Sequence, residues 1–175
     1  MTESSPHETF DGFVAAQSRR LLHAAELLVG PSDAEDLVQS VLLRMYGRWS
    51  KIRRQDPVGY ARRSLVNAAV DRSRRRRVKE VLVDSVPDAV QSGQDHGLMN
   101  ADRDSVLRAL SGLTPRERAV VVLAYYDDLS EAQIAADLGV ASGTVKSTRS
   151  RALLKLRVSD HLTDQPRAIE EVREK

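Results

Sequence analysis

The chain has 175 residues, enough for one ordinary domain or two small ones, and its 41% hydrophobic and 30% charged residues exclude an intrinsically disordered protein. Aromatic residues make up only 4% and β-branched residues rarely alternate with polar ones, so no sheet is expected, and the absence of cysteine excludes disulfides and thiolate metal sites. The formal net charge of +2 indicates no partner by itself, so the distribution of charge along the chain matters more.

The N-terminal segment carries neither a basic stretch nor an apolar one, so we expect no signal peptide. The longest apolar runs, such as residues 119–126, are too short to span a bilayer. We therefore expect a cytoplasmic protein without membrane insertion.

In the first half of the chain, apolar residues recur every three or four positions in three segments, which predicts three helices. These helices are expected over 10–29, 32–49 and about 58–77. Gly30 and Pro31 end the first, and Ser32 with Glu35 three residues later predicts a capping box that opens the second. The polar stretch 50–57 breaks the pattern before the third.

Periodicity is lost over about 78–100, where proline, glycine and small polar residues predict a flexible linker, and returns afterwards. Thr114 with Glu117, and Ser130 with Gln133, form two further capping boxes that open helices. The sequence thus predicts an all-α protein of two small helical domains. Its predicted parts are a disordered N-terminus at 1–9, a first domain at 10–80, the linker at 81–100, a second domain at 101–160 and a polar C-terminal tail at 161–175.

The second domain contains the sharpest pattern. A short capped helix, a turn at Gly139 and a longer basic helix follow the plan of a helix-turn-helix, in which the second helix enters the major groove of DNA. Between Lys146 and Arg157 there are five cations and no acid, which favours DNA contact over a solvated helix face. The candidate DNA contacts are Ser142, Thr144, Lys146, Ser147, Arg149 and Arg151.

The third predicted helix carries eight cations on or just beyond it, among which Asp71 is the one acid. A run of four arginines fits a solvated helix end as well as a surface for phosphates. Asn67 on the same helix and the nearby Trp49 and Tyr60 add the chemistry of single-strand binding, because aromatic rings stack on unpaired bases. Each aromatic ring also fits a core position, so both interpretations stay open.

These motifs together resemble a known family. Asp33-Ala-Glu-Asp-Leu-Val-Gln39, Met45-Tyr-Gly-Arg-Trp49, Tyr60-Ala-Arg-Arg-Ser-Leu-Val-Asn67 and Asp71-Arg-Ser-Arg-Arg-Arg are similar to region 2 of extracytoplasmic-function sigma factors. Leu113-Thr-Pro-Arg-Glu-Arg-Ala-Val-Val-Val-Leu123, Leu129-Ser-Glu-Ala-Gln-Ile-Ala-Ala-Asp-Leu-Gly139 and Gly143-Thr-Val-Lys-Ser147 resemble region 4. The match covers about 10–80 and 101–158 and is nearest to the SigE-like subgroup. A helix-turn-helix alone also resembles response-regulator output domains, but both regions in this order are highly specific.

The resemblance implies an alternative sigma factor that binds core RNA polymerase through the β′ clamp and the β flap, and that reads promoter DNA as duplex and as single strand. Core polymerase contacts are implied at Asp36, Leu37, Gln39 and Leu42. Contacts to the −10 element are implied at Trp49, Arg53, Arg62, Arg63, Asn67, Arg72, Arg74 and Arg75. The candidate contacts on the basic helix would read the −35 element.

The chain departs from the family pattern in three places. Ser40 replaces a common acid and Leu42 a frequent aromatic residue, which puts the details of polymerase affinity in doubt. The usual serine cap of the recognition helix falls on Ala141, so we expect Ser142 to cap it instead. Many relatives carry Arg-Leu at Thr148-Arg149, so the −35 preference cannot be transferred.

Two other functions compete with this one. A stand-alone helix-turn-helix regulator would bind duplex DNA without polymerase. A nucleic-acid hydrolase would need clustered metal ligands or an acid–base pair, and the four histidines are scattered, so we expect no enzyme, no metal site and no cofactor. Since nothing beyond the second domain indicates a built-in sensor, the hypothesis for control is a separate partner, an anti-sigma factor.

Overall fold

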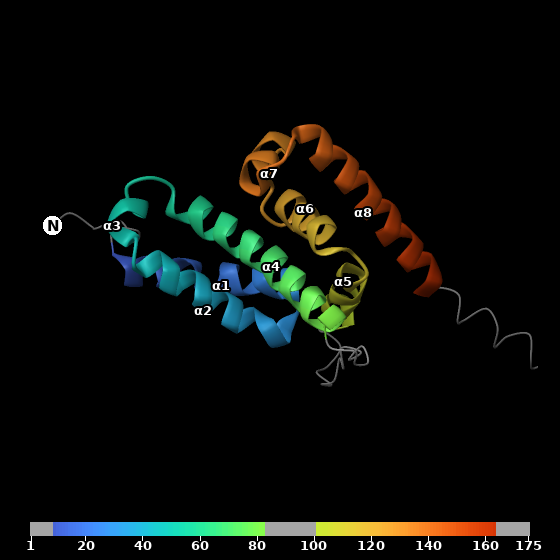
Figure 1. The fold of residues 1–175 in the computed structure, drawn as a ribbon, viewed down its shortest axis with the longest axis horizontal. Helices are drawn as coiled ribbons and strands as arrows, with labels where there is room; N and C mark the ends of the chain where they lie inside the picture. The colour runs from blue at the N-terminus through green and yellow to red at the C-terminus, as the bar shows by residue number, and fades with distance from the viewer. Residues whose placement is uncertain (1–8, 83–100, 164–175) are drawn as a thin grey trace, which may run out of the picture. The chain divides into compact units, whose positions relative to one another are not determined.

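The computed structural model describes residues 9–82 and 101–163, and within these ranges the chain forms eight α-helices and no strand (Figure 1). The chain divides into two compact units, with α1–α4 in the first and α5, α6, α8 and most of α7 in the second. The predicted all-α class with two helical domains is confirmed. The predicted linker from 83 onward and most of the predicted N-terminus and tail lie outside the described residues, so the domain boundaries stay a prediction.

The first unit is a small bundle in which α1, α2 and α4 pack against one another, as Figure 1 shows. Its helices are α1 (Phe10–Val29), α2 (Pro31–Tyr46), α3 (Trp49–Ile52) and α4 (Pro57–Leu82). The largest side chains buried between them come from all three long helices, namely Phe13, Val41, Met45, Leu65 and Val66. Burying these side chains is the main favourable term for so small a unit.

The predicted capping box of Ser32 and Glu35 is wrong. Helix α2 begins one residue before Ser32, at Pro31, and its N-cap is Gly30 without a side-chain cap. The reason is that proline fixes φ near the helical value and has no N–H to leave unpaired, so it suits the first helical position. Gly30 adopts a φ of 86°, and its N–H also closes the end of α1 on the carbonyl of Glu26 at 2.9 Å.

The stretch 50–57 is more ordered than its polar sequence indicates. The second helix ends at Tyr46, and Trp49–Ile52 form the separate turn α3, which buries Ile52. Asp56 then caps α4, since its carboxylate accepts a hydrogen bond from the N–H of Gly59 at 2.8 Å. A Cβ at Gly59 would displace that carboxylate from its present position, so glycine leaves room for the cap.

The second unit follows the predicted pattern more closely. Its helices are α5 (Ala101–Ser111), α6 (Pro115–Tyr125), α7 (Glu131–Leu138) and α8 (Ser142–Thr163). Both predicted capping boxes are present. The N–H of Thr114 donates to Glu117 and that of Ser130 to Gln133, each at 2.9 Å, and the return bonds from both third residues are 3.3 Å.

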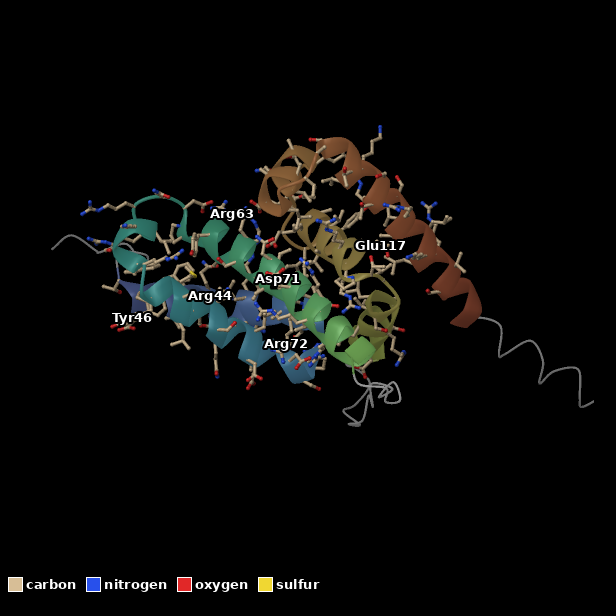
Figure 2. The ribbon with its side chains drawn as sticks, viewed as in Figure 1. Arg44, Tyr46, Arg63, Asp71, Arg72 and Glu117 are labelled. Atoms are coloured by element: carbon tan, nitrogen blue, oxygen red, sulfur yellow. The ribbon has the colours of Figure 1, made fainter. Side chains whose placement is uncertain are left out.

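Two charged side chains of α6 join the helices of the second unit. Arg118 donates to the carbonyl of Leu110 at 2.9 Å and to that of Leu113 at 3.3 Å, which ties the end of α5 to α6. Burial lowers the pKa of this guanidinium, which remains protonated. Glu117, labelled in Figure 2, is buried and accepts two hydrogen bonds from Lys155 of α8, at 2.8 and 2.9 Å.

The pKa of Glu117 results from two opposing effects. Burial raises it, because a low-dielectric environment disfavours the charged carboxylate. The hydrogen bonds from Lys155 and Thr114 lower it by more, so the net pKa lies below the ordinary value of 4.5. The ionised carboxylate therefore stabilises the fold fully above pH 4.5, and this contribution is lost as the pH falls through the lower pKa of the folded state.

We predict that Glu117→Gln lowers the free energy of unfolding by about 1–2 kcal/mol at pH 7, because Lys155 loses its partner but is itself half exposed. The difference from the wild type should shrink as the pH falls from 5 to 3. Urea unfolding followed by circular dichroism at several pH values measures it. The control is Asp104→Asn, an exposed carboxylate of α5. A Glu117→Gln deficit that is the same at pH 3 as at pH 7 would contradict the prediction.

Candidate nucleic-acid interface

Helices α7 and α8 form the predicted helix-turn-helix. Ile134 of α7 and Val145 of α8 are completely buried, and the small Ala135 of α7 is buried as well. Gly139 makes the turn with a φ of 64°, the left-handed conformation expected from the sequence. The N–H of Val140 closes the turn on the carbonyl of Ala135 at 3.0 Å.

The expected cap of α8 is wrong. The carbonyl of Ala141 accepts the N–H groups of Thr144 at 2.9 Å and of Val145 at 3.2 Å, so Ala141 is the N-cap and Ser142 is the first helical residue. A helix starts after the residue whose backbone carbonyl accepts the first intrahelical hydrogen bond. Here the turn after Gly139 determines which carbonyl that is, and the nearby serine does not. The hydroxyl of Ser142 is therefore available to other partners.

Helix α8 divides its sides between the core and solvent. Val145, Thr148 and Ala152 are buried at helical spacing. Five of the six predicted −35 residues lie on exposed positions, namely Ser142, Thr144, Lys146, Ser147 and Arg151. The sixth, Arg149, is half-buried at the border of this exposed face.

Arg149 forms an ion pair that the sequence did not predict. Its Nη2 lies 2.5 Å from Oε1 of Glu131, which belongs to the first turn of α7. Both side chains are about one third exposed, at 34% for Arg149 and 32% for Glu131. The pair therefore joins the two helices of the helix-turn-helix at its surface.

The predicted −10 residues on α4 fall into two groups. Asn67, Arg74 and Arg75 are exposed, and so is Arg53 in the turn after α3. Arg62, Arg63 and Arg72 are half-buried, and Nη1 of Arg63 lies 3.9 Å from the capping carboxylate of Asp56.

Asp33 at the start of α2 binds two of the arginines near the end of α4. Its Oδ1 lies 2.6 Å from Nη2 of Arg72, and its Oδ2 lies 2.7 Å from Nη2 of Arg76. Figure 2 shows Arg72 extending from α4 on the side of α2. Within the described part of the chain, Arg74 and Arg75 form no ion pair. One acid therefore pairs with two arginines of the run, of which Arg76 stays 59% exposed, and does not pair with Arg74 or Arg75.

Trp49 belongs to an aromatic cluster at one end of the first unit. Its ring meets Phe10 edge to face, with centroids 5.4 Å apart, and Phe13 at 5.2 Å. Tyr46 meets Phe10 from the other side at 5.2 Å. The indole N–H of Trp49 is buried and is the one buried side-chain polar atom without a hydrogen-bond partner among the described residues. The packing supports the core interpretation of this ring, and a role with DNA stays a prediction.

The four predicted polymerase contacts on α2 do not share one face. Asp36 and Gln39 are exposed and Leu42 is half-buried. Leu37 is only 2% exposed and packs in the core, so it can support such a contact but not make it.

Sequence reasoning missed two exposed apolar side chains on α2, Leu43 at 74% and Tyr46 at 65% (Figure 2 labels Tyr46). Their signal was present, since both fall off the buried stripe of Val41 and Met45. The partners of Asp33, Glu117 and Glu131 had no such signal, because each lies 18 or more positions away in the sequence.

The described residues contain neither a candidate membrane span nor a candidate metal centre. No helix there is long and apolar enough to cross a membrane. No group of three or more histidine or acidic side chains lies close enough together to hold a metal ion in that part of the chain.

The model of sigma-70 region 2 matches residues 13–78, which cover most of the first unit, and the model of sigma-70 region 4 matches residues 103–156 in the second. The chain belongs to the sigma-70 family. This agrees with the resemblance read from its motifs, and the two regions occur in the expected order.

Curated sigma factors are similar over most of their length. The RNA polymerase sigma-E factor of Streptomyces avermitilis is 40% identical over 150 residues, which is 85% of this chain and 83% of that protein. The ECF RNA polymerase sigma factor SigL of Mycobacterium tuberculosis is 36% identical over 143 residues, 78% of this chain and 80% of that protein. The extracytoplasmic-function type predicted from the sequence is thereby confirmed.

Two solved structures resemble the sigma factor in fold. The sigma factor RpoE of Bartonella quintana, in complex with the anti-sigma factor NepR, has a TM-score of 0.69 and 25% identity, covering 89% of this chain and 98% of that one. CnrH, in complex with the cytosolic domain of CnrY, has a TM-score of 0.60 and 21% identity, covering 88% and 90%, and supports the fold alone.

We predict that Asp33→Asn lowers the free energy of unfolding of the first unit by about 1 kcal/mol, because Arg72 and Arg76 lose a shared, half-buried partner. The loss should shrink in 1 M salt, as expected for partly exposed charges. Urea unfolding followed by the fluorescence of Trp49, the one tryptophan of the chain, reports on this unit. The matched control is Glu35→Gln, an exposed acid of the same helix. Equal effects of the two substitutions would show that the ion pairs contribute nothing.

Proposed function

We propose that this sigma factor binds core RNA polymerase and directs promoter-specific transcription initiation by reading the −35 element with α8 and the −10 element with α4. The observation that carries the proposal is the pairing of both sigma regions in order, each on its own helical unit. It is an alternative sigma factor, a specificity subunit rather than an enzyme, and it acts in the cytoplasm.

The proposed −35 contacts rest on the exposed side of α8. Lys146 and Arg151 are cations suited to phosphates, whereas the hydroxyls of Ser142, Thr144 and Ser147 can exchange hydrogen bonds with base edges. The buried stripe on the opposite side fixes the orientation of α8 in its unit, so these groups point outward together. Such an arrangement suits a major groove.

The proposed −10 contacts rest on α4 and the turn before it. Asn67 offers an exposed amide that can hydrogen-bond a base edge, and Arg53, Arg74 and Arg75 offer exposed charge to the backbone. Melting a promoter costs a few kcal/mol for each unstacked base step, roughly the scale that stacking, hydrogen bonding and charge neutralisation can offset. Recognition of the melted strand would make that compensation depend on sequence.

The proposed polymerase contact is the exposed side of α2, toward the β′ clamp, with the second unit toward the β flap. Asp36 and Gln39 offer polar groups there, and Leu43 with Tyr46 adds apolar area on the same helix. Exposed apolar side chains on an otherwise polar helix are typical of partner-binding surfaces. Two weak DNA-binding units would then gain affinity through effective concentration, once the polymerase holds both.

An anti-sigma factor is the proposed regulator. One solved relative, the sigma factor RpoE, was captured with such a partner, the anti-sigma factor NepR. Control by a separate protein fits a chain in which the two sigma regions account for most of the sequence.

A stand-alone helix-turn-helix regulator is not favoured. It would use the second unit alone, and it would leave the region 2 match and the exposed surface of α2 without a role.

Run-off transcription with core polymerase on genomic fragments tests the proposal. We expect initiation at a small set of sites only when both this protein and core polymerase are present, and weak binding of promoter duplex by the protein alone. Tight, specific duplex binding without polymerase, together with no core-dependent initiation, would support the stand-alone regulator instead.

We further predict that Lys146→Ala weakens promoter use by about five- to tenfold, the cost of one charged contact to DNA, with a shallower salt dependence. Run-off yield and holoenzyme binding at two salt concentrations measure both effects. The matched control is Arg157→Ala, an exposed cation on the same helix about 16 Å further along its axis. Equal loss from both variants would mean that the positive charge of α8 acts without a defined contact surface.

Asn67→Ala should act at a different step. We expect normal closed-complex binding but about tenfold less open complex, because the amide would contact a base only after melting. Permanganate footprinting of the −10 region separates the two steps. Loss of closed-complex binding as well would indicate that Asn67 contacts the duplex rather than the melted strand.

A further inference from the structure

The ion pair of Glu131 and Arg149 lies on the helix-turn-helix, and the proposed function gives Glu131 no role. It connects the first turn of α7 to α8, with Nη2 of Arg149 2.5 Å from Oε1 of Glu131. A guanidinium carries five N–H donors, more than one carboxylate can engage, so Arg149 keeps donors for a further ligand. Because the side chain is still one third exposed, a ligand can reach those donors.

We propose that Glu131 is a positioning residue that orients Arg149 to read one base of the −35 element. This inference rests on the proposed function, since it assigns a specificity determinant to the same helix. Arginine recognises guanine through two parallel N–H donors, which requires a defined orientation of the guanidinium plane. An acid that already holds one edge of the group would supply that orientation before DNA binds.

Three features of α7 make Glu131 a firm support. The residue lies in the first helical turn, where the positive end of the helix dipole stabilises a carboxylate. The neighbouring capping box of Ser130 and Gln133 fixes the backbone at this point. The helix is anchored by Ile134, which is completely buried. Glu131 belongs to α7 and Arg149 to α8, so their ion pair fixes the position of the guanidinium relative to α7.

The position of Arg149 on α8 also suits base reading. It follows Lys146 by three residues, so both lie on neighbouring turns along one side of the helix. Thr148 and Ala152 on either side of it in sequence are buried, which places Arg149 at the edge of the exposed face and next to α7. A partly buried guanidinium loses less conformational freedom on binding than a fully exposed one.

A second explanation of the pair must be separated from this one. A carboxylate beside DNA repels phosphates, and Arg149 could serve only to neutralise Glu131. In that case Arg149 reads nothing, and removing Glu131 would improve binding to every promoter. If Arg149 reads a base, removing Glu131 would weaken discrimination at one position instead. Neutralisation therefore predicts a gain in binding to every promoter on loss of Glu131, and base reading predicts a loss of discrimination at one position.

The experiment uses the holoenzyme and a promoter found in the genomic run-off screen, with its −35 element randomised. Each template carries a transcribed barcode linked to its −35 sequence. Barcodes in the transcripts made by the wild type, Glu131→Ala, Glu131→Gln, Arg149→Ala and the double variant Glu131→Ala/Arg149→Ala are sequenced to give the preference at each base. Two controls accompany them. Asp104→Asn removes an exposed acid from the same unit, and Arg151→Ala removes an exposed cation from the same helix.

We expect Arg149→Ala to abolish the preference at one −35 position, a loss of about tenfold or more as for a bidentate contact to a base. Glu131→Ala should reduce the preference at that same position by about three- to tenfold, and Glu131→Gln by less, because its amide oxygen can still accept from Arg149. The double variant should match Arg149→Ala. Arg151→Ala should weaken all sequences together, and Asp104→Asn should change none.

Three results would overturn the inference. Better use of every sequence by Glu131→Ala, with rescue of Arg149→Ala in the double variant, would establish simple neutralisation. A uniform loss that follows a lower melting temperature would make the pair structural only. If the wild-type holoenzyme initiates from no member of the library while core polymerase is active with another sigma factor, the proposed function fails together with this inference.

Discussion

A lysine or arginine beside a half-buried carboxylate pairs with it in preference to solvent, because the low local dielectric strengthens the attraction and an unpaired charge there is costly. This constraint divides the cations of the two basic helices. Asp33 retains Arg72 and Arg76, Glu117 retains Lys155, and in each case the cation joins two helices of its own unit. The cations that lack such a carboxylate are then the ones whose charge is available to phosphates.

The division changes how a run of positive charge should be interpreted. Arg74 and Arg75 lie between Arg72 and Arg76 in the sequence, yet Arg72 and Arg76 pair with Asp33 whereas Arg74 and Arg75 do not. Residues 72 and 76 lie one turn apart on the same side of α4, so one carboxylate reaches both, whereas residue 74 points away. Part of a basic run is thus structural, and only part of it can act as an interface.

Glu131 and Arg149 lie between these two cases. Their pair joins α7 to α8, as Glu117 joins α6 to α8, but both members keep access to solvent. An ion pair at the surface contributes little stability on its own. In this sigma factor the pair would instead orient the guanidinium of Arg149, so it supports an inference about specificity rather than about folding.

The sequence by itself determined the helices of the second unit, its two capping boxes and the turn at Gly139, because these depend on residues within four positions of one another. It also determined the family, through the order of two sets of local motifs. It misjudged the starts of α2 and α8, since Pro31 and the backbone carbonyl of Ala141 outweighed the nearby serines.

Only the tertiary structure decided which side chains are free to act. Leu37 is buried in the core, and Trp49 packs against Phe10 and Phe13. Arg72 and Arg149 pair with acids that lie 39 and 18 positions away in the sequence. Such outcomes depend on how distant helices pack, which sets burial and brings opposite charges together. Local spacing indicates the apolar face of a helix but not which distant side chains meet it, so a binding surface can be located from sequence while the availability of its individual residues cannot.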